Sequence, residues 1–313
     1  MILPKLDYKK AKSLEEAIEY FEKSNGEAAY FAGGTDLIPR IKLRLRTPSL
    51  VIDLKGIEEM VGIKKTDEMY VIGANTTIFE LKNSEIIREN LPTLYEACAQ
   101  TSCEVLQMRG TIGGNILQDT RCLFYNKSLT WRRAKGFCYK MGGNVCHATG
   151  GKNVCYANYS SDLATALLSL GSKLVIVGKD GQRKCDFEEI LTGKPEKPFN
   201  LRQGEIVKEI IIPGGKRQGA FEKIRIRGSI DYPLINGAFT MDSKGGKLVV
   251  GAIGSKPCVY SVETIEEERV KILSETVFND LKPVNNTVVS PVYRKKMGKV
   301  IAIKLIEKTK KGA

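Results

Sequence analysis

Four of the eight cysteines in this chain of 313 residues fall within one polar stretch, residues 119–157. They are Cys122, Cys138, Cys146 and Cys155, with 15, 7 and 8 residues between them. In a reducing compartment, clustered cysteines are more often metal ligands than disulfides. No C-x-x-C pair occurs among the four, so the usual zinc-ribbon and bacterial ferredoxin spacings are both absent. The spacing alone leaves structural zinc and an iron–sulfur cluster open, with zinc as the commoner site.

The neighbours of these cysteines are polar and basic. Between residues 119 and 157 there are seven Lys or Arg and one acid, a net charge of +6. Such surroundings suit either metal, because four thiolates on a metal centre carry net negative charge. The only histidine, His147, follows Cys146 and could be a ligand, but with four thiols available a place beside the metal or in solvent fits it better. The other cysteines lie in or beside regular elements and are expected to be ordinary thiols: Cys98, Cys103, Cys185 and Cys258.

Two glycine-rich turns follow strand-like segments, "FAGGTDL" at 31–37 and "GTIGGN" at 110–115. Consecutive glycines carry no Cβ atoms, so successive backbone N–H groups can converge on an anionic oxygen. Thr35, Thr111 and Asn115 would add side-chain donors. Neither turn is the G-x-G-x-x-G of a Rossmann unit or the G-x-x-x-x-G-K-[ST] of a P-loop. One Gly-Gly pair is usually only a tight turn, whereas two pairs with polar partners favour a phosphate site.

The elements that would position these groups are short strands mixed with helices. A helix is predicted at 13–26, where Ser13 and Glu16 form a capping box and Gly26 closes the helix. Other predicted elements are a helix at 78–90 capped by Thr77 and Glu80, a helix at 93–100, a helix at 160–171 with Ser160 or Ser161 as N-cap, and a hairpin turning at Asp180-Gly181. A second series of strand-like and helical segments starts at about Ala220. The mixture of short strands and helices along the chain predicts α+β domains.

Composition and charge narrow the class of protein. With 42% hydrophobic residues, a chain of this length can build two or three domains. The N-terminus shows no signal-peptide pattern and no run of roughly 18 apolar residues occurs, so we expect a cytoplasmic protein without a membrane partner. The net charge of +13 is spread along the chain and its densest runs lack interleaved aromatic residues, so we expect no nucleic-acid partner. A single histidine also disfavours a Ser-His-acid hydrolase.

The order of these motifs resembles the FAD-binding subunits of the molybdenum hydroxylases, the xanthine dehydrogenase family. Members carry an "AGGT"-type turn, then "TIGGN", then a helix that begins with "SDL", and the resemblance covers nearly the whole chain. It implies a PCMH-type FAD-binding domain of the vanillyl-alcohol-oxidase kind, with two subdomains, at 1–218. It also implies a C-terminal α+β domain at 219–313, like that of the CO dehydrogenase flavoproteins.

A long insertion separates this chain from most of that family. About 40 residues intervene here between "TIGGN" and the "SDL" helix, and they hold all four loop cysteines. The segment that begins "GGNILQDTRCLFYN" resembles the flavoprotein subunits of 4-hydroxybenzoyl-CoA reductases, whose inserted loop binds a 4Fe–4S cluster. The resemblance therefore implies a 4Fe–4S cluster held by the four loop cysteines, within an insertion at about 119–157.

The resemblance also assigns FAD contacts to individual residues. It places the FAD pyrophosphate at Phe31, Ala32, Gly33, Gly34, Thr35, Asp36 and Leu37, with a second contact loop at Thr111, Gly113, Gly114, Asn115 and Gln118. Asp162 would hold the sugar or ribityl hydroxyls, Ile206 or Val207 would pack near the flavin ring, and Lys223 would lie near the carbonyl edge of the ring. Asp36 and Gln118 depart modestly from the family pattern. No catalytic residue is implied.

The activity implied by the resemblance is electron transfer within a molybdenum-dependent 4-hydroxybenzoyl-CoA reductase. Electrons would enter from ferredoxin, cross the 4Fe–4S cluster and FAD, and pass to a molybdopterin-binding large subunit and a 2Fe–2S small subunit. The assembly would be a dimer of heterotrimers, with the substrate site in a partner subunit. Two alternatives stay open: an FAD subunit of another molybdenum hydroxylase, and a zinc-stabilised module that binds nucleic acid or protein.

Overall fold

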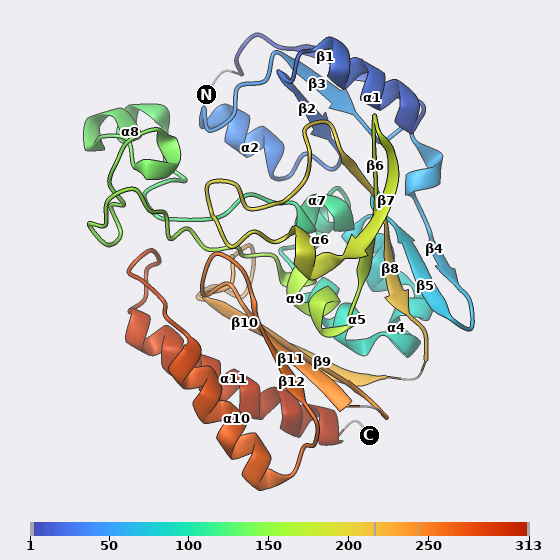
Figure 1. Ribbon diagram of the computed structural model, residues 1–313, viewed down its shortest axis with the longest axis vertical. Helices are drawn as coiled ribbons and strands as arrows, with labels where there is room; N and C mark the ends of the chain where they lie inside the picture. Colours follow the sequence, from blue (N-terminus) through green and yellow to red (C-terminus); the bar gives the residue numbers. More distant parts are fainter. Residues whose placement is uncertain (1–2, 216, 244, 312–313) are drawn as a thin grey trace.

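The computed structural model describes residues 3–215, 217–243 and 245–311. Within these ranges the chain forms three β-sheets, one parallel and two antiparallel, with helices packed between and outside them (Figure 1). This mixture confirms the predicted α+β class. None of the helices in the described ranges is long and apolar enough to cross a membrane.

The first sheet is small, parallel and N-terminal, with the strand order β1-β3-β2. Its elements are β1 (Asp7–Lys10), α1 (Leu14–Lys23), β2 (Ala28–Phe31), α2 (Leu37–Lys42) and β3 (Leu50–Asp53). The glycine turn at 32–36 is the connection from β2 to α2, so the parallel sheet places this turn at the end of a strand.

The start of α1 follows the sequence pattern only in part. Ser13 is the N-cap and accepts from the amide of Glu16 at 3.2 Å. The Glu16 carboxylate accepts instead from the amide of Lys12 at 2.7 Å, so the predicted capping box is half formed. The helix ends at Lys23, earlier than predicted, and is followed by two residues with positive φ, Asn25 and Gly26.

The second sheet has five antiparallel strands in the order β4-β5-β8-β6-β7. Its strands are β4 (Ile63–Lys65), β5 (Met69–Gly73), β6 (Lys173–Gly178), β7 (Gly181–Asp186) and β8 (Ile206–Pro213). Gly178 pairs with Gly181, so the hairpin turn consists of Lys179 and Asp180, one residue earlier than predicted. Segments on either side of the cysteine-rich insertion thus meet in one sheet, and the insertion leaves the sheet intact.

Seven short helices follow β5 in the described ranges. They are α3 (Ile78–Asn83), α4 (Glu85–Asn90), α5 (Pro92–Gln100), α6 (Glu104–Gln107), α7 (Ile112–Ile116), α8 (Leu129–Lys135) and α9 (Asp162–Ser169), with single 3₁₀ turns η1 (Glu58–Met60), η2 (Tyr139–Met141) and η3 (Phe187–Ile190). Helices α5 and α9 pack between the second and third sheets, whereas α8 lies in the insertion, apart from both (Figure 1). The single helix predicted at 78–90 is two helices, because Ser84 leaves the helical conformation and caps α4. The predicted capping box of Thr77 and Glu80 is confirmed at the start of α3.

The third sheet is antiparallel, in the order β12-β11-β10-β9. Its elements are β9 (Gln218–Ile224), β10 (Ile235–Asp242), β11 (Gly245–Gly251), β12 (Cys258–Val262), α10 (Glu267–Asp280) and α11 (Pro291–Lys311). One face of the sheet packs on α11, and the other face packs on α5 and α9 (Figure 1). The domain boundary between residues 218 and 219 stays a prediction, and β9 begins at Gln218.

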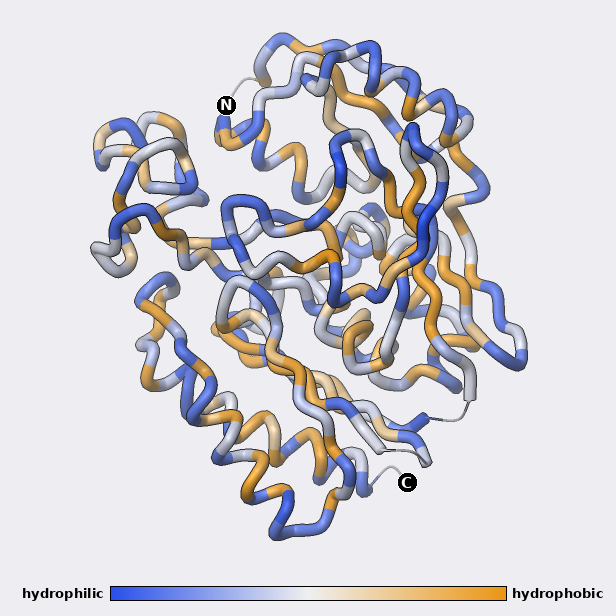
Figure 2. Tube along the Cα trace, viewed as in Figure 1, coloured by the Kyte–Doolittle hydropathy of each residue, from blue (hydrophilic) through white to orange (hydrophobic). Residues whose placement is uncertain are grey.

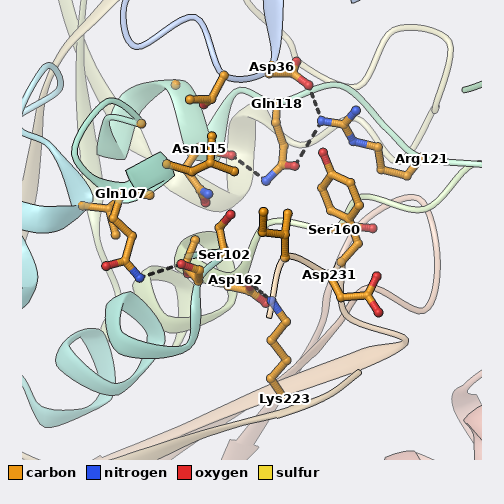
Figure 3. Close-up of a pocket in the computed structure, with 18 of the residues that line it drawn as sticks. Asp36, Ser102, Gln107, Asn115, Gln118, Arg121, Ser160, Asp162, Lys223 and Asp231 are labelled. Carbon is orange, nitrogen blue, oxygen red and sulfur yellow. Dashed lines mark hydrogen bonds and ion pairs between the residues drawn. The ribbon is translucent and has the colours of Figure 1, made fainter. Parts of the chain in front are cut away.

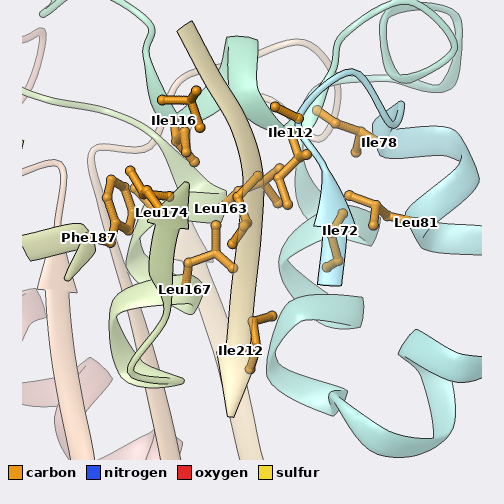
Figure 4. Packing of buried hydrophobic residues seen from close by; sticks show 14 of the residues in the cluster. Ile72, Ile78, Leu81, Ile112, Ile116, Leu163, Leu167, Leu174, Phe187 and Ile212 are labelled. Carbon is orange, nitrogen blue, oxygen red and sulfur yellow. The ribbon is translucent and has the colours of Figure 1, made fainter. Parts of the chain in front are cut away.

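Two apolar clusters stabilise this arrangement. The larger one joins the second sheet to α3, α5, α7 and α9, and Figure 4 shows Ile72 and Ile212 of the sheet beside Leu163 and Leu167 of α9. The smaller one fills the space between the third sheet and α10 and α11. Hydrophobic residues run along the inner strands of both antiparallel sheets (Figure 2). Helix α9 therefore packs between the second and third sheets, and this packing fixes the position of its first residue, Asp162.

Candidate functional site

Two adjoining cavities lie where the first sheet, α7 and the third sheet meet. The first cavity has a volume of about 270 Å³ and the second about 470 Å³. Both are lined by Thr35, Asp36, Thr111 and Gly114, so they open onto each other at the two glycine turns. Together they have the size that cofactor sites in proteins typically have, roughly 300–1,000 Å³.

The second cavity is built on the turn between β2 and α2. In the described part of the chain, the amide N–H groups of Gly33, Gly34 and Thr35 donate to no protein acceptor. Three successive backbone N–H donors without a protein acceptor, at the wall of a cavity, form a place for an anionic oxygen. The side chains of Arg40 and Arg46 line the same cavity and add positive charge. This half of the site can therefore hold a phosphate group.

The glycines of the first turn are also needed by the chain itself. A Cβ atom on Gly33 would lie 1.9 Å from the carbonyl oxygen of Arg109. Gly34 has a φ of +73°, and a Cβ there would lie 2.4 Å from the ring of Phe31. Both positions therefore exclude a side chain for local steric reasons as well as for access to an anion.

The second glycine turn forms the start of α7 and follows the helix α6, where the sequence suggested a preceding strand. Thr111 is the N-cap and accepts from the amide of Gly114 at 3.0 Å. A Cβ on Gly113 would lie 2.8 Å from Ala74, so this glycine allows close packing of two segments. A Cβ on Gly114 would meet only Thr111 Oγ1, at 3.0 Å, and Gly114 lines both cavities. Gly114 therefore keeps the junction of the cavities open.

A buried ion pair lies at the wall of the first cavity (Figure 3). Lys223 Nζ on β9 donates to Asp162 Oδ2 at 2.6 Å, and Asn236 Nδ2 on β10 donates to Asp162 Oδ1 at 2.8 Å. Asp162 is the first residue of α9, whereas the N-cap is Ser161, which accepts from the amide of Ala164. Asp162 is therefore not the helix cap, and both of its oxygens are held by residues of the third sheet.

A second ion pair crosses the junction between the cavities. Asp36 pairs with Arg121, and Figure 3 shows Arg121 reaching from the insertion toward Asp36 and Gln118. The guanidinium carbon of Arg121 lies 4.5 Å from the ring centre of Tyr232. Burial disfavours the charged guanidinium, but Tyr232 and Asp36 outweigh it, so the pKa of Arg121 is raised. The insertion is thus tied directly to the first glycine turn.

All the residues predicted to bind FAD line one of the two cavities, except Phe31, whose ring lies under Lys55 Nζ at 3.9 Å. Of these residues, the ones that line only the second cavity are Ala32, Gly33, Gly34, Leu37, Gly113, Ile206 and Val207. The ones that line only the first cavity are Asn115, Gln118, Asp162 and Lys223. Ile206 and Val207 line the second cavity and Lys223 lines the first, and the placement of these residues near the flavin ring stays a prediction.

Several lining residues were missed by the sequence reasoning. Arg40 precedes the basic run at 41–46 and Arg46 ends it, and neither was predicted to be a site residue. Their position directly after a glycine turn could have indicated an anion site. Arg121 and Tyr232 also line the first cavity, and nothing in their sequence surroundings indicated it.

The four cysteines of the insertion converge without forming a site for a single ion. Burial raises the pKa of Cys122, and the nearby Cys146 and Cys138 add to the rise. Burial also raises the pKa of Cys155 to about 11, with Cys122 and Cys138 contributing. Across the described ranges, however, no three or more His, Cys, Asp or Glu side chains are arranged to hold a metal ion, and all eight cysteines are free thiols.

Four thiols are the number of ligands that either a structural zinc ion or a 4Fe–4S cluster takes. The thiolates of a four-iron cluster bind different irons, so they need not surround one point as zinc ligands do. The backbone amides of Phe124 and Tyr125 act to lower the pKa of Cys122, and that of Ala157 acts to lower the pKa of Cys155, although burial outweighs them at both thiols. Peptide donors to sulfur are among the groups that tune such clusters.

His147 lies apart from any ligand role in this geometry. Its Nε2 is 2.9 Å from the carbonyl oxygen of Gly136, and its ring packs 5.9 Å from the ring centre of Phe124. The histidine therefore helps to fold the insertion around the thiols.

Asp119 anchors the entrance of the insertion to the segment that follows the first glycine turn. Its carboxylate pairs with Arg40 at 3.0 Å and Lys140 at 2.6 Å, and accepts from the Tyr125 hydroxyl at 2.7 Å. Burial would raise the pKa of Asp119, but Lys140 and Arg40 outweigh it and hold the pKa below its usual value. Arg132 of α8 donates to the carbonyl oxygen of Leu43 at 2.6 Å. The cysteine loop therefore packs on the wall of the second cavity.

The other side of the insertion is held by the connection between α10 and α11. The amide of Leu123 donates to the Asn286 carbonyl at 3.2 Å, and the side chains of Asn286 and Asn158 form a reciprocal pair at 3.0 and 3.1 Å. Arg294, fully buried, donates to Asn286 Oδ1 at 3.2 Å. Both ends of the loop, next to Cys122 and Cys155, thus depend on the C-terminal elements.

Comparison with known proteins agrees with this geometry. A family model described as the FAD binding domain in molybdopterin dehydrogenase matches residues 4–215. The glyceraldehyde dehydrogenase medium chain of Sulfolobus acidocaldarius is 24% identical over 97% of this chain and 98% of its own length. The carbon monoxide dehydrogenase medium chain of Afipia carboxidovorans is 26% identical over 99% of this chain and 98% of its own length.

Solved structures show the same fold. A chain of reconstituted CO dehydrogenase from Oligotropha carboxidovorans superposes with a TM-score of 0.81 at 23% identity, with 100% of both chains covered. A chain of quinoline 2-oxidoreductase from Pseudomonas putida 86 superposes with a TM-score of 0.80 at 21% identity, with 100% of this chain and 99% of that chain covered. With the family match over residues 4–215, the chain belongs to the FAD-binding domains of molybdopterin dehydrogenases and is an FAD-binding oxidoreductase subunit of the molybdenum hydroxylase class.

Proposed function

We propose that this chain is the electron-transfer subunit of a molybdenum hydroxylase-type reductase that carries FAD and a 4Fe–4S cluster. The observation that carries the FAD part is the pair of joined cavities at the two glycine turns. FAD bound there accepts and donates electrons, while the protein residues bind and orient it. The free amides of Gly33, Gly34 and Thr35, with Arg40 and Arg46, would hold the pyrophosphate.

The two halves of FAD are assigned to the two cavities. The flavin ring would occupy the first cavity, where Lys223 and Asp162 lie at the wall. The adenosine half would occupy the second, with Ile206 and Val207 as apolar contacts.

The partners would be a molybdopterin-binding large subunit and a 2Fe–2S small subunit, since the relatives are medium chains of larger dehydrogenases. Exposed apolar side chains on α6 and on the loop before β10 flank the first cavity and suit a protein interface: Val105, Met108, Ile226, Ile230 and Tyr232. Electrons would leave the flavin through this side. Co-purification of the partner subunits with the chain tests this part.

The finer assignment is a 4-hydroxybenzoyl-CoA reductase with ferredoxin as the electron donor, and it depends on the cysteine insertion alone. The named relatives, which include CO and glyceraldehyde dehydrogenases, favour the broader alternative of an FAD subunit of another molybdenum hydroxylase. A zinc-stabilised module that binds nucleic acid is set aside, because the FAD-domain match spans residues 4–215.

One anaerobic preparation tests three assignments separately: the bound FAD, the 4Fe–4S cluster and the substrate of the complex. Protein-bound FAD near one per chain supports the flavoprotein assignment, and its absence contradicts it. Iron near four per chain supports the cluster, whereas zinc or no metal leaves the broader alternative. Turnover of 4-hydroxybenzoyl-CoA by the assembled complex with reduced ferredoxin supports the specific enzyme, and activity only on another substrate rejects it.

A further inference from the structure

We propose that Arg121, a residue of the insertion, completes the FAD site by neutralising Asp36 at the turn that would hold the pyrophosphate. The inference rests on the proposed function, because it takes the pyrophosphate to lie at the first glycine turn. It assigns Arg121 a positioning role that acts through Asp36, and it requires no cluster or other metal in the insertion.

Asp36 is an unfavourable residue at an anion site. It directly follows the free amides of Gly33, Gly34 and Thr35, and it lines both cavities at their junction. Two negative charges at short distance repel each other, and the repulsion is stronger near a protein surface than in bulk water. An uncompensated carboxylate at this position would therefore disfavour a pyrophosphate bound in the same turn.

Both oxygens of the Asp36 carboxylate are held by the start of the insertion. Arg121 Nη2 donates to Asp36 Oδ1 (Figure 3), and the amide of Asp119 donates to Asp36 Oδ2 at 3.4 Å. Arg40 of α2 is farther away, with its Nη1 3.8 Å from Asp36 Oδ2. The guanidinium of Arg40 is also shared, because its Nη2 pairs with Asp119 at 3.0 Å. Arg121 is therefore the main cationic partner of Asp36.

The position of Arg121 is fixed by further contacts. Its guanidinium carbon lies 4.5 Å from the ring centre of Tyr232, and its Nη2 lies 3.5 Å from Gln118 Oε1. Its backbone pairs with that of Asn158 in both directions, at 2.7 and 2.8 Å, and this bridge joins the two ends of the insertion. None of these contacts involves a thiol. Arg121 is thus held beside the first glycine turn by contacts that need no metal.

The charges linked at this junction are net positive only because of Arg121. The linked side chains are the cations Arg40, Arg121 and Lys140 and the carboxylates Asp36 and Asp119, three positive against two negative charges, or +1. Without Arg121 the set is neutral, and Asp36 keeps only the more distant guanidinium of Arg40. A positive set favours a bound pyrophosphate, because charge-assisted contacts to phosphate are the strong ones.

The test is a set of charge variants of the full chain, purified with any partner subunits that accompany it. Arg121→Gln removes the cation, Arg121→Lys retains it, Asp36→Asn removes the carboxylate, and Asp36→Asn/Arg121→Gln removes both. Arg133→Gln changes an exposed arginine of the same insertion and is the control. The dissociation constant for FAD is measured on each deflavinated protein by quenching of flavin fluorescence, and circular dichroism checks the folding.

The expected order of affinities follows the charge. Arg121→Gln should weaken FAD binding about tenfold or more, which corresponds to roughly 1.4 kcal/mol. Arg121→Lys should recover most of that loss, and Arg133→Gln should match the wild type. Asp36→Asn should bind FAD at least as tightly as the wild type, because Arg121 is then free to face the pyrophosphate. The double variant should again resemble the wild type, because it removes one charge of each sign.

The outcomes that overturn the inference are distinct from failure of the proposed function. Folded Arg121→Gln with wild-type affinity overturns it, and so does a double variant that binds as weakly as Arg121→Gln, since Arg121 would then act through packing. If Arg121→Gln does not fold, Asp36→Asn decides: binding weaker than in the wild type overturns the inference. Wild-type protein that binds no FAD overturns the proposed function as well.

Discussion

Lys223 and Asp162 form an ion pair that joins the first strand of the third sheet to the start of α9. The pair is 2.6 Å long, and the two side chains are 1% and 4% exposed. Because both charges are buried, neither can be removed alone without leaving the other unpaired. The pair therefore stabilises the junction of the two sheets as well as lining the first cavity, and a single substitution tests both roles at once.

A pair of variants separates these roles. Asp162→Ala should lower the free energy of unfolding by about 3–5 kcal/mol, because it leaves the Lys223 ammonium buried and uncompensated. The double variant Asp162→Asn/Lys223→Gln is neutral and keeps a possible hydrogen bond, so it should recover most of that loss. Urea unfolding of the apo-protein measures the free energy. If the carboxylate contacts FAD, the double variant regains stability but still binds FAD weakly. Full FAD binding by the double variant would make Asp162 purely structural.

Gly114 gives the cleanest test of the FAD cleft. Gly114→Val should place a side chain at the junction of the two cavities, where only Thr111 Oγ1 is within 4 Å of the added Cβ. We expect loss of most bound FAD with little loss of stability, because Val has a somewhat higher helix propensity than Gly. Gly34→Val is a poorer test, because its φ of +73° strains any side chain.

A matched control for Gly114→Val is Gly254→Val. A Cβ on Gly254 would meet only the carbonyl oxygen of Lys256, at 3.8 Å, and the residue lines neither cavity. Flavin absorbance per chain after gel filtration is the measurement. Normal flavin content in folded Gly114→Val would show that the cofactor does not pass through this junction.

The fold and the FAD cleft could be predicted from the sequence, because local patterns indicate the helices and turns and the order of the glycine-rich motifs indicates the family. Thr77 and Glu80 form the predicted capping box, and the two glycine turns meet at one cleft. Pairings between distant segments were not predictable. Arg121 reaches Asp36 across 85 residues and Asn286 reaches Asn158 across 128 residues, and neither contact leaves a periodic signal. The boundary at Ser84 between α3 and α4 was missed for a different, local reason: Ser84 accepts a hydrogen bond from the Ile87 amide and so caps a new helix within an otherwise helical pattern.

Asp119 should make the insertion sensitive to acid. Its pKa is held below the usual value, so its stabilising effect is fully present above the unfolded pKa of about 3.9 and is lost as pH falls through the folded pKa. At pH 7, Asp119→Asn should lower the free energy of unfolding by about 3 kcal/mol, because Lys140 and Arg40 lose a buried partner. The difference between wild type and variant should shrink below about pH 4.

Urea unfolding of the chain between pH 7 and pH 3 measures this difference, and the metal content is measured at each pH so that loss of metal is distinguished from protonation of Asp119. Glu275→Gln is the control, because its pair with Lys299 is exposed and is expected to contribute less than about 1 kcal/mol. A gap between wild type and Asp119→Asn that stays constant down to pH 3 would contradict the assignment.

The ligand set of the insertion gives the last prediction. We expect any single replacement by Ser of Cys122, Cys138, Cys146 or Cys155 to lower the iron content from near four per chain. Each replacement should also increase proteolysis between residues 119 and 157. Metal binding orders this loop because its polar residues bury little apolar surface of their own. FAD should largely remain, because its cavities are lined mainly by residues outside the insertion. Cys258→Ala is the matched control, since Cys258 lies on β12 in the third sheet. Iron that stays unchanged in Cys138→Ser, or zinc in place of iron in the wild type, would reject this ligand set.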